Sequence, residues 1–156
     1  MTYKFYDTCS LLLKVDNLWE EDSTIVISSI TLEELEHIKT SANKDPDIKF
    51  AARKLVHELD THYDSYKVII WNNDLALNLK EAGLPETADS KIIASANWFE
   101  SQHKNDDVIF ITNDLCCKHL ARAFLQIPVE SYEEDASDYD GYLEIIMDDD
   151  EMVKFY

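Results

Sequence analysis

The stretch that decides the fold is Val108-Ile109-Phe110-Ile111-Thr112-Asn113-Asp114, in which four apolar residues run directly into a polar triplet. An uninterrupted apolar run of this length is typical of a strand buried on both faces, as the parallel strands of α/β proteins are. Ligands of open α/β sheets bind in the crevice beyond the carboxyl ends of the strands. We therefore expect a site at Asp114 if other strands of the sheet also end at acids.

Strands and helices alternate along the rest of the chain. Strands are expected at residues 3–6, 24–30, 67–71, 108–111 and 127–129. Helices are expected at residues 31–40, 48–63, 74–82 and 115–124, and two more are expected to begin at residues 10 and 87. Thr31-Leu32-Glu33-Glu34 has the spacing of a capping box, which favours a helix start at Thr31. Gly83 and Pro85 are expected to end the helix that begins near Asp74. This order predicts a three-layer α/β/α sandwich with a central, mainly parallel sheet.

The composition indicates one globular domain. At 156 residues and 46% hydrophobic content, the chain can bury one sizeable core but not two ordinary ones. Two glycines and three prolines argue against a loop-rich all-β fold. No apolar window is long enough to span a membrane, and the first residues do not form a signal peptide. Three cysteines, two of them adjacent, are not a disulfide framework, so we expect a cytoplasmic protein.

The acids are distributed unevenly. The net charge is −18, yet residues 130–151 contain 11 acids and no Lys or Arg. Without residues 130–156, 21 acids face 13 bases, a net charge of −8. We therefore expect a domain over 1–130 and an acidic C-terminal extension over 131–156, which is a linker or an edge hairpin. The run Asp148–Glu151 could bind a hard cation, although a run of like charges is usually a solvated segment.

Four acids fall at corresponding places in the expected layout. Asp7 ends the first strand, Glu34 lies in the first turn after the second strand, Asp89 lies in the first turn of its helix, and Asp114 ends the central strand. Carboxylates that cluster raise each other's pKa, and divalent cations relieve this repulsion. Mg²⁺ and Mn²⁺ prefer oxygen ligands. Two such ions roughly 4 Å apart can activate a water and stabilise the leaving oxygen of a phosphodiester.

Each acid also has a simpler role open to it. An Asp that follows a strand is often a helix N-cap, and Asp89, which comes after Thr87, is the most cap-like of the four. Glu33 competes with Glu34 for the second place in the cluster. If Glu33 folds back on the backbone of Thr31, Glu34 is the freer ligand. The occurrence of all four acids in order favours a site over four independent caps.

The same segments resemble the PIN domain family. The resemblance spans nearly all of the chain and rests on Asp7–Leu12, Ile25–Ser28, Leu32–Glu36, Ala88–Ala94 and Ile111–Asp114. It is greatest to the N-terminal PIN domain of PhoH-type ATPases. That subtype is indicated because Tyr139–Glu144 followed by Asp149–Glu151 resembles the segment that joins PIN to PhoH.

The resemblance implies a PIN-like fold and a Mg²⁺- or Mn²⁺-dependent endoribonuclease. The catalytic and metal-ligand acids that it implies are Asp7, Glu34, Asp89 and Asp114. Four neighbouring polar residues are expected either to orient these acids by hydrogen bonds or to serve only as turn and cap residues: Thr8, Ser10, Thr112 and Asn113. Family members usually carry Asn where this chain has Cys9, so one polar contact is expected to be missing. Lys91 either contacts a phosphate of the substrate or faces solvent.

Two hypotheses about activity follow. The first is a ribonuclease that hydrolyses RNA at the four acids. The second is a regulatory or binding domain that keeps the fold but cleaves poorly alone, because few Lys and Arg are available to hold RNA phosphates. The chain has no Walker A pattern, so an ATPase would be a separate PhoH-type partner domain, and the chain is either an excised domain or a stand-alone relative. A homo-oligomer is expected only by analogy.

Overall fold

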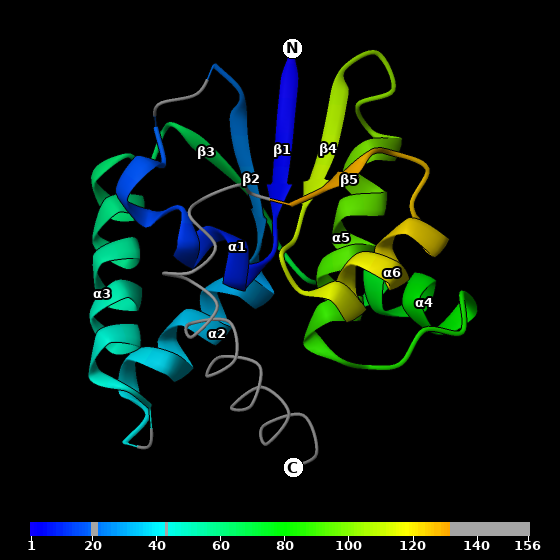
Figure 1. The fold of residues 1–156 in the computed structure, drawn as a ribbon. Helices are drawn as coiled ribbons and strands as arrows, with labels where there is room; N and C mark the ends of the chain where they lie inside the picture. The colour runs from blue at the N-terminus through cyan, green and yellow to red at the C-terminus, as the bar shows by residue number, and fades with distance from the viewer. Residues whose placement is uncertain (20–21, 43, 132–156) are drawn as a thin grey trace.

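The computed structural model describes residues 1–19, 22–42 and 44–131 (Figure 1). In chain order the elements are β1 (Thr2–Tyr6), α1 (Thr8–Leu13), a 3-10 turn (Val15–Asn17), β2 (Thr24–Ser28), α2 (Ser29–Thr40), α3 (Pro46–Thr61), β3 (Tyr66–Ile69), α4 (Asn73–Glu81), α5 (Ala88–Ser101), β4 (Asp107–Ile111), α6 (Leu115–Phe124) and β5 (Val129–Glu130). The predicted alternation of strands and helices is confirmed, with ends that differ by a few residues.

The strands of the described residues form one parallel sheet in the order β3-β2-β1-β4-β5. β1 and β4 lie side by side at its centre, although about a hundred residues separate them, and Tyr6 pairs with Ile111 at their carboxyl ends. The residues that follow these two strands therefore meet at one edge of the sheet. This topology confirms the expected α/β fold with a parallel sheet.

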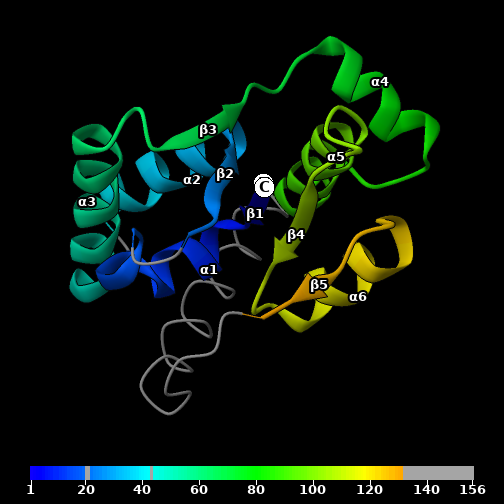
Figure 2. The ribbon, with the colours of Figure 1, turned by 90° about the horizontal axis from the view of Figure 1, so that it is seen from above.

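Helices cover both faces of the sheet, as Figure 2 shows. Residues of α1, α2 and α3 pack in one apolar cluster, and residues of α5 and α6 pack in a second cluster on the other face. β2 shows why both faces need cover: Ile25 and Ile27 belong to the first cluster, while Val26 between them belongs to the second. Successive strand residues point to opposite faces, so uninterrupted apolar strands require the three-layer sandwich.

The start of α2 corrects the sequence-based expectation. The strand ends at Ser28, and the hydroxyl oxygen of Ser28 caps the helix by accepting a hydrogen bond from the backbone N–H of Ile30 at 3.1 Å. Serine is among the preferred N-cap residues, so the helix begins at Ser29 rather than at the predicted Thr31. Thr31 is instead buried inside the helix. Glu34 consequently lies in the second turn of α2, not in the first.

Two further expectations concern α4 and the C-terminal extension. α4 ends as predicted, because Gly83 adopts a positive φ of 75° and its N–H donates to the carbonyl of Lys80 at 3.1 Å. The predicted linker or edge hairpin, with its run Asp148–Glu151, lies outside the described residues.

Within the described part of the chain, no helix combines the length and the apolar character needed to cross a membrane.

Candidate active site

Asp7 and Asp114 lie at the carboxyl ends of the two central strands. Each is the N-cap of the helix that follows: Asp7 Oδ1 accepts from the Ser10 N–H at 2.9 Å, and Asp114 Oδ1 accepts from the Cys116 N–H at 3.0 Å. Both side chains are nearly buried, with 3% of Asp7 and 8% of Asp114 exposed. The cap interpretation of these acids is therefore correct. The capping hydrogen bond occupies one carboxylate oxygen of each acid.

One threonine connects the two strand ends. The hydroxyl of Thr112 donates to Asp7 Oδ2 at 2.5 Å and accepts from the backbone N–H of Asp114 at 3.2 Å. The backbone adds a third contact, since the Asp7 N–H donates to the carbonyl of Ile111 at 3.1 Å. The pairing of β1 with β4 thus fixes where the carboxylate of Asp7 lies relative to Asp114.

The carboxyl group of Asp7 is difficult to ionise. Its pKa is raised from 3.8 to about 7, chiefly by burial and to a smaller extent by the nearby charge of Asp89, although hydrogen bonds from Thr112 and Ser10 act in the opposite direction. Those donors are neutral, and burying a carboxylate without a compensating positive charge is costly. A cation placed beside Asp7 would remove much of this cost.

Asp89 belongs to the same neighbourhood but is not a helix cap. The hydroxyl of Thr87 caps α5 by accepting from the Ser90 N–H at 3.2 Å, so the cap-like interpretation of Asp89 was wrong. The buried thiol of Cys117 on α6 reports which charges are near: burial first, and then the charges of Asp7, Asp89 and Asp114, raise its pKa. Three of the four predicted acids therefore lie near enough to this thiol for their charges to act on it. The sequence pattern gave no reason to single out this cysteine.

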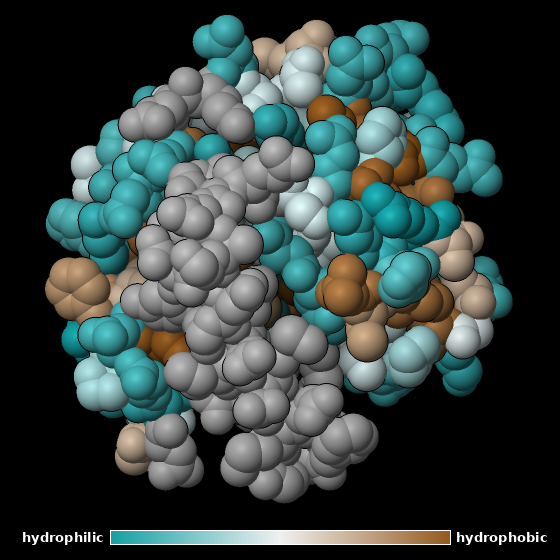
Figure 3. Space-filling view, in the orientation of Figure 1, coloured by the Kyte–Doolittle hydropathy of each residue, from teal (hydrophilic) through white to brown (hydrophobic). Residues whose placement is uncertain are grey.

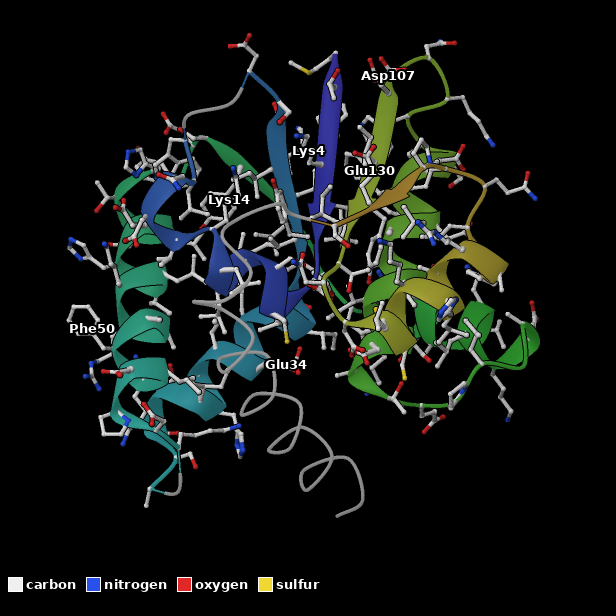
Figure 4. The ribbon with its side chains drawn as sticks, in the orientation of Figure 1. Lys4, Lys14, Glu34, Phe50, Asp107 and Glu130 are labelled. Atoms are coloured by element: carbon white, nitrogen blue, oxygen red, sulfur yellow. The ribbon has the colours of Figure 1, made fainter. Side chains whose placement is uncertain are left out.

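Glu34 approaches the same edge of the sheet from α2. Its Oε1 accepts a hydrogen bond from the Thr8 hydroxyl at 2.6 Å, and Thr8 follows Asp7 directly in the chain. The Thr8 hydroxyl also lies 3.2 Å from that of Thr31, a contact that sequence reasoning missed. Figure 4 shows Glu34 at the end of the molecule toward which β1 points. Glu33, the alternative, is exposed on the helix.

The other predicted residues contribute around these acids. The hydroxyl of Ser10 donates to Asn113 Oδ1 at 3.2 Å, which links α1 to the loop after β4. Cys9, which stands where the family usually has Asn, lies on α1 and is buried in the first apolar cluster. Lys91 is partly exposed on α5, and its Nζ lies 5.9 Å from the centroid of the Trp71 ring. That distance permits a cation–π contact, so Lys91 is not simply a solvent-facing lysine.

The acids suit a hard cation by their chemistry. They offer carboxylate oxygens, the ligand type that Mg²⁺ and Mn²⁺ prefer, and the buried carboxyl of Asp7 gains most from a nearby positive charge. Among the described residues, however, no three His, Cys, Asp or Glu side chains form a group that could hold a metal ion as they stand. The ligand roles of Asp7, Glu34, Asp89 and Asp114 remain a prediction.

Comparisons with known proteins agree with this fold. The chain has the fold of a domain of a functionally unknown protein from Methanocaldococcus jannaschii, with 23% identity, a TM-score of 0.52, and coverage of 86% of this chain and 93% of that one. It is also similar to a member of the VapBC family of toxin–antitoxin systems, VapBC-5 from Mycobacterium tuberculosis, with 20% identity, a TM-score of 0.51, and coverage of 85% and 98%.

At the level of sequence, no curated protein matches the chain. Residues 5–133 match the sequence profile of the PIN domain, and this range includes both central strands and all four acids. A match over most of the chain shows the family, and the two solved structures agree with it in fold. The chain belongs to the PIN domain family.

Proposed function

We propose that the chain is a ribonuclease that hydrolyses RNA phosphodiester bonds with Mg²⁺ or Mn²⁺ at Asp7, Glu34, Asp89 and Asp114. The observation that carries the proposal is the state of Asp7: a buried carboxyl at the end of a central strand, held by neutral donors and close to other acids. Such a group is unfavourable to ionise in the absence of a cation. Membership of the PIN domain family supports a metal-dependent nuclease as the class of activity.

The chain's own residues hold and orient the acids. Thr112 positions the carboxylate of Asp7 through its hydroxyl, and Thr8 does the same for Glu34. These acids would hold a divalent cation, which would supply an activated water and positive charge beside the phosphate. A cation also favours the ionised form of Asp7, because a nearby positive charge lowers the pKa of a carboxyl.

The test is cleavage of a labelled single-stranded RNA with Mn²⁺, with Mg²⁺ and with EDTA. We expect cleavage with the metals only, and its loss in both Asp7→Asn and Asp114→Asn. The matched control is Asp107→Asn, since Asp107 is an exposed acid at the opposite end of β4 (Figure 4). A circular RNA of the same sequence is cut only if the mode of cleavage is endonucleolytic, as we propose.

Metal binding is measured separately. Because a ligand that binds only the folded state raises stability, Mn²⁺ should raise the unfolding midpoint of the wild type and of Asp107→Asn but not that of Asp7→Asn. Cleavage that persists in Asp7→Asn and Asp114→Asn would show that the activity comes from a contaminant. An unfolding midpoint that does not respond to Mn²⁺ would contradict the metal site itself.

A second candidate is a binding or regulatory domain that needs a partner to cleave RNA. The charge of the chain favours it, because 32 acids face 14 bases. Among the residues that Figure 3 colours, hydrophilic ones outnumber hydrophobic ones on the visible face. We propose a PhoH-type ATPase as that partner, a proposal that rests on the sequence resemblance alone. RNA cleavage that appears only when such an ATPase and ATP are added would support this candidate over the first. Full activity of the chain by itself would exclude it.

A further inference from the structure

A pocket of about 260 Å³ opens beside the candidate acid Glu34, between α2 and the first turn of α5. Its lining combines apolar and polar side chains: Ile30, Glu33, His37, Ile38, Ala88 and Lys91, together with the candidate site residue Glu34. It therefore shares one wall with the proposed catalytic centre. Pockets for drug-sized ligands occupy roughly 300–1,000 Å³, so this one suits a smaller group, about the size of a single nucleobase.

The polar residues of the pocket stand on opposing walls. Glu33 and His37 are four residues apart on α2, a spacing that puts side chains on the same face of a helix. Lys91 comes from α5, across the pocket. An acceptor is thus available on α2 and a cation on α5, and Ile30, Ile38 and Ala88 supply apolar lining.

We propose that this pocket binds a guanine base of the RNA next to the scissile phosphate, with Glu33 as the residue that selects it. This inference rests on the proposed ribonuclease function. Guanine presents two adjacent N–H donors, N1–H and the N2 amino group, which match the two oxygens of one carboxylate. Its O6 is an acceptor, and Lys91 and His37 are the residues of the lining that can act as its donor.

The other bases fit a carboxylate less well. Adenine and cytosine each place a ring nitrogen acceptor beside their amino group, and uracil flanks its single N–H with two carbonyl oxygens. Each of these bases would therefore place an acceptor opposite a carboxylate oxygen of Glu33, where no hydrogen bond can form. The acidic wall also disfavours a phosphate inside the pocket, so a neutral base enters while Lys91 faces the backbone phosphate or O6. Unpaired bases of single-stranded RNA are free to be recognised in this way by their hydrogen-bonding edges.

Binding of mononucleotides tests the pocket without requiring cleavage. GMP, AMP, CMP and UMP are titrated into the full chain in EDTA, and the amide NMR signals of α2 and α5 are followed. We expect GMP to bind roughly 5- to 100-fold more tightly than the other three, the range that a bidentate contact to a base supplies. Glu33→Ala should abolish this preference. The matched control is Glu36→Ala, an exposed acid on the same helix whose recorded contact is a surface ion pair with Lys39.

Three outcomes would overturn the proposal: equal binding of all four nucleotides, a guanine preference that survives in Glu33→Ala, or saturable binding of N-acetylarginine amide in place of GMP. The last would indicate a protein partner that inserts a basic side chain.

RNAs that differ at one position next to the cleaved bond separate this proposal from the nuclease. If the rate of cleavage does not depend on that base, the guanine-binding proposal is wrong and the ribonuclease proposal is kept. If GMP binding depends on Glu33 but the chain cleaves no RNA, the guanine-binding pocket is supported and the ribonuclease proposal is wrong.

Discussion

The four candidate acids fall into two pairs that are built differently. Asp7 and Asp114 follow central strands, are almost entirely buried, and are connected by the hydroxyl of Thr112. Glu34 and Asp89 are carried by helices and are partly exposed, and Glu34 also lines the pocket between α2 and α5. We call the first pair the strand half and the second pair the helix half.

The comparison shows how one edge of a sheet can serve two purposes. The strand half is part of the packed core, so its geometry is fixed by the same hydrogen bonds that pair β1 with β4. The helix half is partly exposed, and its Glu34 lines the pocket between α2 and α5. Variants in the strand half should therefore change both stability and activity, whereas variants in the helix half should change activity or selectivity with little effect on folding.

The largest effect is expected at the first acid. Asp7→Asn should lower the rate of RNA cleavage by about a thousandfold, because a divalent cation contributes several kcal/mol of charge stabilisation and loses a ligand that carries charge. Single-turnover cleavage rates in saturating Mn²⁺ measure the loss. A decrease of the same size in Asp107→Asn would contradict the proposed role of Asp7 as a metal ligand, since that exposed residue lies at the other end of the sheet.

The strand half should also make stability depend on pH in the absence of metal. With a folded pKa of about 7 against an ordinary value of 3.8, Asp7 keeps a proton in the folded state that the unfolded chain loses. Stability therefore falls as pH rises through this window. Relative to Asp7→Asn, the wild type in EDTA should lose about 2–3 kcal/mol of unfolding free energy between pH 5 and 8. Urea unfolding at both pH values measures this, and parallel pH curves for the two proteins would contradict it.

Thr112→Val tests the connection within the strand half. The substitution removes the donor to Asp7 Oδ2 and the acceptor for the Asp114 N–H, so buried groups lose partners. We expect a loss of about 1–3 kcal/mol in unfolding free energy and a loss of roughly 10- to 100-fold in Mn²⁺ affinity. Thr112→Ser keeps the hydroxyl and should recover most of both. Failure of Ser to recover them would mean that the methyl group, not the hydroxyl, matters.

Thr8→Val is the corresponding change in the helix half and should have the smallest effect. Glu34 loses its hydrogen bond from Thr8, but it is partly exposed and water can replace the donor. The expected loss is about 0.5–1.5 kcal/mol in unfolding free energy, with Thr8→Ser as the control. If Thr8→Val destabilises the chain more than Thr112→Val, the distinction between the two halves is wrong.

The sequence predicted the strand half better than the helix half, for a physical reason. Asp7 and Asp114 follow short apolar strands directly, so the pattern of the strand fixes the position of the acid. The start of α2 was predicted at Thr31 because a capping box is a local signal, but the strand pairs only as far as Ser28, which then becomes the cap.

The contacts between segments distant in the chain had no sequence signal of their own. The hydrogen bond from Thr112 to Asp7 spans 105 positions, and Cys117 lies among the acids only because α6 packs on the sheet. A sequence pattern can indicate which residues belong to such a site. The distances between them in space depend on the order of the strands in the sheet.

The pairing of β1 with β4 has a consequence for synthesis of the chain. Asp7 leaves the ribosome early, whereas Thr112 and Asp114 emerge more than a hundred residues later, and no strand between them can substitute for β4. Because a domain folds as a unit during translation, a growing chain has no complete acid cluster until its last third has been made. If the chain is the ribonuclease that we propose, it cannot cleave the messenger RNA that encodes it until translation of the domain is nearly finished.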